Sequence, residues 1–355
     1  MAFKKEVFGT LPDGRTADCY TLVNDSGGSA SFTNLGGIWL TMTVPDRDGH
    51  IADVLLGYDS VEKCLTYPGH MGEIVGRNAN RIGNAAFTLN GVTYQLAVNS
   101  GDKHNLHSGL DYYRDRLWDA EVEEGSLGTR ITFSLVSPDG DQGYPGNAEI
   151  AVSYTLTPDN SLQIDYLATA DADTVCNFTN HAYFNLAGHA SGSAMSQLVW
   201  IDADTFTIAD ADSIPTGELA AVTATPMDFR VMKPIGQDIE ADYESLKFGN
   251  GYDHNWVLNH PAGELALSAK AVDPVSGRVM EVYTDLPGVQ FYTANSFPGG
   301  YKGKDGVEYG PRQGYCFETQ YFPDAINKPA FPSPVLKAGD EYKTTTIYHF
   351  ACFSK

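Results

Sequence analysis

His181 is the residue of this sequence whose type and surroundings point most directly to proton chemistry. It lies within residues 177–188, a strand-like and aromatic stretch that also carries Asn180 and Asn185. Sheet packing would hold such a stretch rigidly, with its polar groups among apolar ones. An imidazole has an unperturbed pKa of about 6.5, so it can exchange a proton near neutral pH. A lone histidine among aromatic residues is more often a satisfied core residue, so the assignment depends on the other polar groups.

Glu318 is the second candidate for a functional residue. It lies in an otherwise apolar run between Phe317 and Tyr321. A carboxylate with aromatic neighbours is costly unless it is paired or used. Glu318 is therefore the candidate that a purely structural role explains least well.

Three further polar clusters lie in or beside predicted strands and loops. They are residues 76–82, with Arg77, Asn78, Asn80 and Arg81, residues 104–109, with His104 and His107, and residues 251–256, with Asp253. Taken singly, each has a structural explanation, because the arginines can be surface or ion-paired residues and Asp253 can cap a turn. His104 and His107 have the spacing of a metal pair, but zinc would need a third ligand and an open position. We expect no metal site.

Together these clusters combine Arg, His, Asn, Asp and Gln side chains with aromatic ones. The sequence shows no nucleophilic serine motif, no glycine-rich phosphate loop and no paired carboxylates at a recognisable spacing. Each hydroxyl of a sugar both donates and accepts hydrogen bonds, and Trp or Tyr can cover an apolar sugar face. The clusters therefore suit a neutral, polyhydroxylated ligand.

The composition of the chain indicates which classes of partner it can bind and in which cellular compartment it is expected. The chain has 45 acidic and 23 basic residues, a formal net charge of -22, which disfavours capture of nucleic acid or an anionic membrane. Its first ten residues lack the apolar run and cleavage site of a secretory signal, and no stretch approaches 18 apolar residues. The five cysteines are scattered, with no Cys-x-x-Cys pair. We expect a cytoplasmic protein with reduced thiols, bound to neither nucleic acid nor membrane.

The elements that must position these groups have the pattern of short antiparallel strands. Apolar residues alternate over residues 87–96 around Asn90 and Gly91, which predicts a β-hairpin. Residues 131–135, 150–156 and 162–166 alternate in the same way. Further strands are predicted at residues 17–23, 38–44, 51–56, 197–201, 265–272, 278–283, 289–293, 315–321 and 344–353, and one or two helical turns at residues 60–65.

This pattern predicts an all-β protein, a large antiparallel β-sandwich in a single domain of residues 1–355. Amphipathic helices of ten or more residues are absent from the pattern, and no linker or internal repeat divides the chain. The longest irregular segments are predicted at residues 99–113, 203–251 and 295–314. Segments of that length tend to carry function or to cover a cleft.

The five clusters, in the order in which they occur along the sequence, resemble the aldose 1-epimerase family, the galactose mutarotases. The resemblance runs over nearly the whole chain and is carried by residues 36–58, 76–82, 106–109, 180–186, 251–255, 287–292 and 318–320. One departure is Ser108, where the family usually has a second glycine. The resemblance implies a galactose mutarotase-like supersandwich, no cofactor, and interconversion of the α and β anomers of free hexoses such as galactose and glucose.

The same resemblance assigns roles to individual residues. Glu318 matches the family's general base and His181 its general acid, and the sugar-binding positions match Asn80, Arg81, His107, Asp253 and Gln290. Opening a pyranose ring requires removal of the proton from the C1 hydroxyl and donation of a proton to the ring oxygen. With ordinary pKa values, an ionised Glu318 would accept the first proton and a protonated His181 would donate the second.

Two other functions remain open. An epimerase of sugar 6-phosphates would need a cluster of basic side chains, and the sequence shows none beyond Arg77 and Arg81. A carbohydrate-binding module without activity would be expected to have lost Glu318 or His181, and both are present. The sequence leaves open which aldose is preferred and whether the protein is a monomer or a homodimer.

Overall fold

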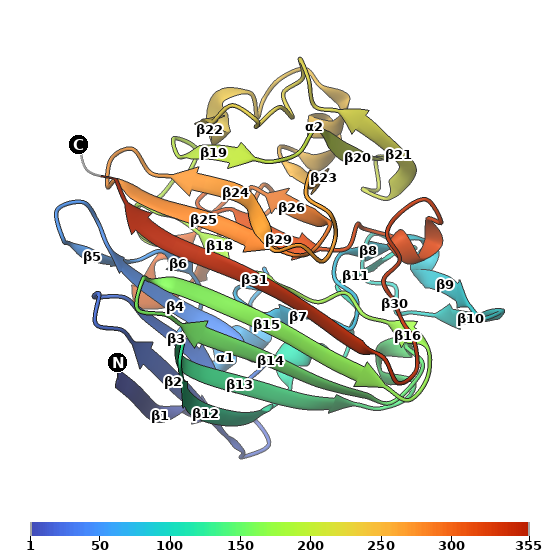
Figure 1. The fold of residues 1–355 in the computed structure, drawn as a ribbon, viewed down its shortest axis with the longest axis horizontal. Helices are drawn as coiled ribbons and strands as arrows, with labels where there is room; N and C mark the ends of the chain where they lie inside the picture. Colours follow the sequence, from blue (N-terminus) through green and yellow to red (C-terminus); the bar gives the residue numbers. More distant parts are fainter. Residues whose placement is uncertain (1, 354–355) are drawn as a thin grey trace.

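Antiparallel strands dominate the computed structural model, which describes residues 2–353 (Figure 1). The largest sheet has nine strands, in the spatial order β12 (Asp119–Gly125), β13 (Gly128–Ser137), β14 (Ala148–Leu156), β15 (Ser161–Ala170), β31 (Glu341–Cys352), β25 (Arg278–Thr284), β24 (Ala266–Val272), β19 (Leu198–Ile201) and β22 (Lys233–Pro234). The C-terminal strand β31 thus lies inside this sheet, between β15 and β25.

Two five-stranded sheets accompany the large one. The first has the order β1 (Ala2–Thr10), β2 (Thr16–Val23), β3 (Ser29–Thr33), β4 (Ile38–Pro45) and β5 (Ile51–Asp53). The second has the order β21 (Pro215–Ala221), β20 (Thr205–Ala209), β23 (Asp253–Val257), β26 (Gly288–Tyr292) and β29 (Cys316–Gln320). In Figure 1 the first lies at the lower left and β20 and β21 of the second at the upper right.

Short strands in pairs complete the fold. They are β9 (Ala86–Leu89) with β10 (Val92–Gln95), β8 (Arg81–Ile82) with β11 (Asn105–Leu106), β7 (Ile74–Val75) with β17 (Thr179–Asn180), β6 (Leu55–Leu56) with β18 (Tyr183–Phe184), β16 (Thr174–Val175) with β30 (Val335–Leu336), and β27 (Tyr301–Lys302) with β28 (Glu308–Tyr309). Within residues 2–353 there are two α-helices of six residues each, α1 (Val61–Thr66) and α2 (Glu244–Gly249). Neither has the length or the apolar character to cross a membrane.

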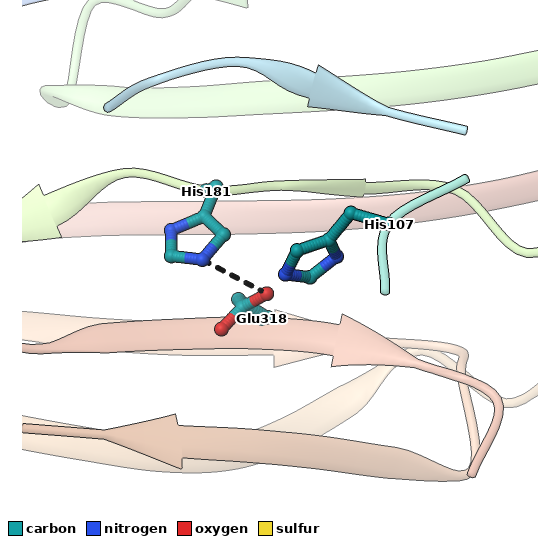
Figure 2. A group of neighbouring side chains, drawn as sticks. All are labelled: His107, His181 and Glu318. Carbon is teal, nitrogen blue, oxygen red and sulfur yellow. Dashed lines mark ion pairs between the residues drawn. The ribbon is translucent and has the colours of Figure 1, made fainter. Parts of the chain in front are cut away.

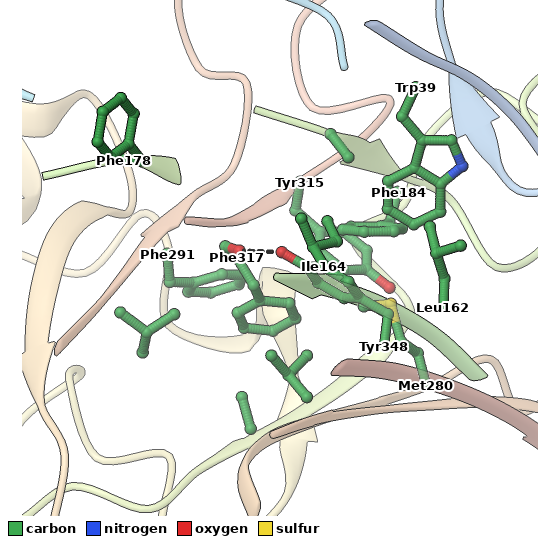
Figure 3. Close-up of a cluster of buried hydrophobic side chains, with 14 of the residues drawn as sticks. Trp39, Leu162, Ile164, Phe178, Phe184, Met280, Phe291, Tyr315, Phe317 and Tyr348 are labelled. Carbon is green, nitrogen blue, oxygen red and sulfur yellow. Dashed lines mark hydrogen bonds between the residues drawn. The ribbon is translucent and has the colours of Figure 1, made fainter. Parts of the chain in front are cut away.

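The hydrophobic core lies between the large sheet and both smaller ones. Phe32 of β3 stacks on Tyr154 of β14 with ring centroids 4.4 Å apart. On the other side, the Tyr348 hydroxyl of β31 donates a hydrogen bond to the Phe317 carbonyl of β29 at 2.8 Å. Figure 3 shows Phe317 stacked on Phe291 at the centre of this core. Burial of these aromatic faces fixes the second small sheet rigidly against the large one.

The structure confirms the predicted β-sandwich and most of its strands. The hairpin around Asn90 and Gly91 forms as β9 and β10, with both turn residues at positive φ, as a two-residue turn of this type requires. The helical turns predicted at residues 60–65 form as α1. The prediction of an irregular segment at residues 203–251 is wrong in part, because this segment contains the hairpin of β20 and β21 and the helix α2. Pro215 and Gly217 in β21 hid the strand pattern.

Candidate active site

A cavity of about 300 Å³ opens beside strands β23 and β29 and brings distant polar groups together. Its lining residues are Pro68, Gly69, His70, Asn80, Arg81, Leu106, His107, His181, Tyr183, Asp253, Tyr292, Ser296, Phe297, Pro298 and Glu318. The volume is that of a small-molecule site, at the lower end of a range of about 300–1,000 Å³. The combination of charged, amide and aromatic walls is the one that the sequence predicts for a polyhydroxylated ligand.

Strand alternation positions Glu318 at this cavity. In β29, Phe317 packs into the core, so Glu318 beside it points to the opposite face. Gln290 of the neighbouring strand β26 is directly opposite Glu318 in the ladder. The Gln290 amide donates a hydrogen bond of 2.7 Å to the carboxylate of Asp253, at the start of β23. Three neighbouring strands thus supply three polar side chains to one region.

His181 reaches the same region from the opposite side. It lies between β17 and β18, and its ring stacks on Tyr183 with centroids 5.0 Å apart. Its Nε2 atom is 3.6 Å from Oε2 of Glu318 (Figure 2). This separation is longer than an ordinary hydrogen bond, so each atom still has the capacity to contact a bound molecule. Both side chains are almost fully buried.

Burial governs the protonation of this pair. It raises the pKa of the Glu318 carboxyl well above its usual value, and the charge of Asp253 raises it further, while Arg81 opposes the shift. Burial, followed by the charge of His70, lowers the pKa of His181 to about 3. These shifts bear on a question that the sequence leaves open, whether burial or a nearby cation governs the pKa of Glu318. Burial prevails over the nearby cation, and it disfavours the charged form of both Glu318 and His181 in the protein alone.

His107 and Asn80 form a hydrogen-bonded unit on the cavity wall. The backbone N–H of Asn80 donates to Nδ1 of His107 at 3.0 Å. Burial also lowers the pKa of His107 well below its usual value, so the ring is neutral. Its Nε2 atom therefore carries the hydrogen and is a donor. Both residues have positive φ, a conformation that is uncommon outside glycine and concentrates at functional sites.

His107, His181 and Glu318 lie close enough together to be considered as a metal site. The chemistry of His107 argues against it. Its Nδ1 accepts a hydrogen bond and its Nε2 carries a hydrogen, so neither nitrogen has a free lone pair for a cation. The three side chains are therefore suited to hydrogen bonding with a ligand rather than to binding a metal ion.

Some of the residues predicted for the site line the cavity, and others lie outside it. Asn80, Arg81, His107, His181, Asp253 and Glu318 line the cavity. Gln290 does not line it but supports Asp253 from behind. His104 also lies outside the cavity lining, with Nδ1 accepting from the Asn84 backbone and Nε2 3.4 Å from Asp212. Arg77 is fully buried elsewhere and donates to backbone carbonyls.

Sequence reasoning missed several residues of the cavity. His70 lines it, and the hydrogen-bonded pair of Glu73 and Arg114 lies behind His70. Phe297 supplies part of the aromatic wall. His70 and Glu73 directly precede the cluster at residues 76–82, and the one available signal was this pair of polar residues between apolar ones.

The fold and the cavity together define a β-sandwich protein with a polar site for a small molecule, at which a histidine and a glutamate lie close together. The model of the family "Aldose 1-epimerase" matches residues 18–349. Galactose mutarotase of Bos taurus is 41% identical over 352 residues, 99% of each chain, and aldose 1-epimerase of Haemophilus influenzae is 38% identical over 96% of this chain and 97% of its own. The crystal structure of galactose 1-epimerase from Lactobacillus acidophilus superimposes with a TM-score of 0.86 at 25% identity, over 99% of each chain.

This chain belongs to the aldose 1-epimerase family and is an isomerase. The resemblance carried by its sequence motifs is confirmed over nearly the whole chain, and so is the galactose mutarotase-like fold.

Proposed function

We propose that this protein interconverts the α and β anomers of free hexoses such as galactose and glucose, with Glu318 as general base and His181 as general acid. The observation that carries this proposal is the position of the two side chains, 3.6 Å apart at the wall of a polar cavity. The Nε atom of Arg81 and Oε2 of Glu318, both from residues that line the cavity, are buried, and within residues 2–353 neither has a hydrogen-bond partner. Hydroxyl groups of a sugar would satisfy such atoms.

The reaction starts from the ionic form of the pair. This form differs from the neutral one by movement of one proton from Glu318 to His181, and hydrogen bonds from sugar hydroxyls to the carboxylate, together with the charge of Arg81, would favour it. Glu318 then removes the C1 hydroxyl proton while His181 protonates the ring oxygen, which breaks the bond between C1 and that oxygen. The product is the open-chain aldehyde.

Ring opening returns the pair to its neutral form. Burial favours that form in the protein alone, so the environment of the pair assists the opening step. Rotation about the C1–C2 bond presents the other face of the aldehyde. The two residues then act in reverse, and the ring closes as the opposite anomer. General acid and general base catalysis each contribute about 10² to 10⁴ in rate.

The remaining cavity groups are proposed to bind the sugar. Asp253 and His107 are placed to accept from and donate to hydroxyl groups, and Tyr292 and Phe297 to cover an apolar sugar face. Gln290 would act by orienting Asp253, to which it donates a hydrogen bond.

Several properties of the whole protein belong to the same proposal. Residues 1–355 would form one domain, supported by the position of the C-terminal strand β31 inside the large sheet. The partner would be a small aldose, with neither nucleic acid nor membrane, and the protein would be a monomer or a homodimer. A cytoplasmic location is supported by the five cysteines, all of which are free thiols.

Polarimetry tests the proposed function. Freshly dissolved α-galactose and α-glucose should reach their equilibrium rotation faster with the protein than in buffer. Galactose 6-phosphate should not be a better substrate, because Arg81 is the one Lys or Arg side chain among the cavity-lining residues. Acceleration with the phosphorylated sugar alone would favour the 6-phosphate epimerase, and no acceleration with any of these sugars would contradict the proposal.

A further inference from the structure

His70 is a cavity residue with an unusual backbone. Its φ is +56°, in the left-handed region, and it lies between Gly69 and Gly72, whose φ values are +108° and +74°. A residue other than glycine is held in this region only when the surrounding structure enforces it, and such residues concentrate at functional sites. The two glycines allow the tight turn that places the His70 side chain at the cavity.

The turn that carries His70 is hydrogen-bonded to the backbone of His181 on both sides. The N–H of Gly72 donates to the His181 carbonyl at 2.9 Å, and the N–H of His181 donates to the Glu73 carbonyl at 3.0 Å. Glu73 and His181 are 108 residues apart in sequence, and these two backbone hydrogen bonds join their segments. The position of the His70 side chain is therefore coupled to that of His181.

The rings of these two histidines are in contact. Their centroids are 5.8 Å apart with an angle of 30° between the planes, which is a stacked arrangement. The His70 ring also meets the edge of His107, with centroids 5.1 Å apart. His181 is thus enclosed between His70 and Tyr183, and removal of the His70 ring would open one side of this enclosure.

A chain of hydrogen bonds anchors the His70 ring from behind. Its Nδ1 atom is 2.8 Å from Oε2 of Glu73, and the other carboxylate oxygen accepts from Arg114 at 3.0 Å. Burial alone would raise the pKa of Glu73, but the charges and hydrogen bonds of His70 and Arg114 prevail and lower it to about 2. The carboxylate is therefore ionised, and Nδ1–H of His70 is the donor.

We propose that His70, anchored through Glu73 to Arg114, is a positioning residue that holds the His181 imidazole in its reactive orientation. This inference rests on the proposed function, because it concerns the group that protonates the ring oxygen. None of the three residues has to touch the reacting atoms. His70 acts through His181.

The charges of His70 and Glu73 act on the pKa of His181, and this effect provides a readout that a merely structural role of His70 would not change. The groups that face His181 are His70, His107, Tyr183, Tyr292, Cys316 and Glu318, with Glu73 behind His70. Burial is the largest cause of the lowered pKa of His181. The charge of His70 lowers this pKa further, and the charge of Glu73 raises it. Loss of the His70 charge should therefore ease protonation of the catalytic pair and move both limbs of its pH profile to higher pH.

Two substitutions both remove the charge of His70 and differ in whether a ring or a hydrogen-bond donor is kept. His70→Gln keeps a donor for Glu73 but removes the ring, and His70→Phe keeps a ring but removes the donor. His189→Gln is the matched control, because His189 is also paired with a carboxylate, 3.3 Å from Asp305, and packs against Tyr309, but does not line the cavity. Mutarotation of α-galactose is followed by polarimetry over a range of pH, and folding is checked by near-ultraviolet circular dichroism.

We expect His70→Gln to lower kcat roughly 10- to 100-fold with little change in KM, as a displaced catalytic group does. His70→Phe should keep more of kcat than His70→Gln because a ring still stacks on His181, both variants should show the pH profile moved upward, and His189→Gln should match the wild type. Equal losses of kcat in the Gln and Phe variants, or wild-type kcat and pH profiles in both, would overturn the inference. If the wild-type protein itself does not accelerate mutarotation, the proposed function fails first. If it does and Glu318→Gln is inactive while both His70 variants behave as wild type, only the role of His70 fails.

Discussion

The proton shared by Glu318 and His181 is the smallest feature on which the proposed mechanism depends. Both side chains are buried, and burial disfavours the charged form of each. The neutral pair and the ionic pair contain the same one proton. The proposed reaction therefore needs the pair to hold one proton, wherever that proton resides, and its pH dependence follows from the two limits of that state.

The first prediction is a pH profile without a limb near the ordinary pKa of histidine. Because the pKa of His181 is lowered to about 3, a second proton joins the pair only at low pH, so the acidic limb should lie well below 6.5. Because the pKa of Glu318 is raised, the pair loses its proton only well above 4.5, which sets the basic limb. We expect kcat/KM for galactose to show no loss through an acidic limb near the ordinary pKa of histidine, about 6.5. An acidic limb centred near 6.5 would show that His181 titrates as an exposed histidine does.

The second prediction separates two arginines that are four positions apart. Arg77 is fully buried and donates to the carbonyl groups of Ser137, Pro145 and Gly146, so Arg77→Met should reduce the free energy of unfolding by at least about 3 kcal/mol. Arg81 lines the cavity, so Arg81→Met should raise KM for galactose about 10- to 100-fold, the effect of losing hydrogen bonds to a charged group.

Urea unfolding and initial-rate polarimetry on both variants check this separation. Arg77→Met should keep the wild-type KM when measured below its unfolding transition, and Arg81→Met should unfold close to the wild-type urea concentration. The reverse pattern would show that the two arginines have been assigned to the wrong roles.

The difference between these arginines was not predictable from the sequence. Both occur in the same polar cluster, and only the fold shows that one is enclosed by carbonyl groups while the other reaches the cavity. His70 was missed for a related reason. Its importance arises from a turn with positive φ and from contacts with Glu73 and His181, which no periodicity records.

At the scale of elements, strand β29 connects stability with chemistry. Its alternation places Phe317 in the core and Glu318 at the cavity. Phe317 stacks on Phe291 with centroids 5.1 Å apart and accepts a hydrogen bond on its carbonyl from Tyr348. The same strand therefore fixes the position of the proposed base through the packing of its opposite face.

The third prediction concerns this packing. Phe317→Ala should lower the free energy of unfolding by about 3 to 5 kcal/mol, because it removes a fully buried ring and leaves a cavity. Phe248→Ala is the control, since that ring is 39% exposed, and its cost should be about 1 kcal/mol or less. Chemical unfolding measures both. Equal costs would contradict the view that β29 is anchored through Phe317.

The long strands were predictable because their alternation is a local property. Strands β13, β14 and β15 each alternate over nine or ten residues, and sequence analysis located all three. The exposed edge strand β1 was missed, because its first six residues are all exposed and show no apolar face. The two-residue strands β17 and β18 around His181 form only through their partners β7 and β6, so tertiary contacts create them.

At the scale of the molecule, the sandwich brings together groups that the chain holds far apart. Asp253 and Glu318 come from one small sheet, His181 from the segment that faces it, and His107 from a loop after β11. The order of the motifs in the sequence identified the family, and the predicted sandwich was confirmed. Which side chains line the cavity and which only support it required the three-dimensional arrangement, as the position of Gln290 behind Asp253 shows.

The measurement that tests the central claim most directly compares turnover with binding in Glu318→Gln. The substitution keeps the shape of the side chain but removes the acid and base function. We predict that polarimetry will show a loss of at least about 10² in the rate of mutarotation of α-galactose, while calorimetry shows galactose binding within a fewfold of the wild type. A Glu318→Gln variant that keeps wild-type turnover would contradict the assignment of Glu318 as the base, and with it the proposed acid–base pair.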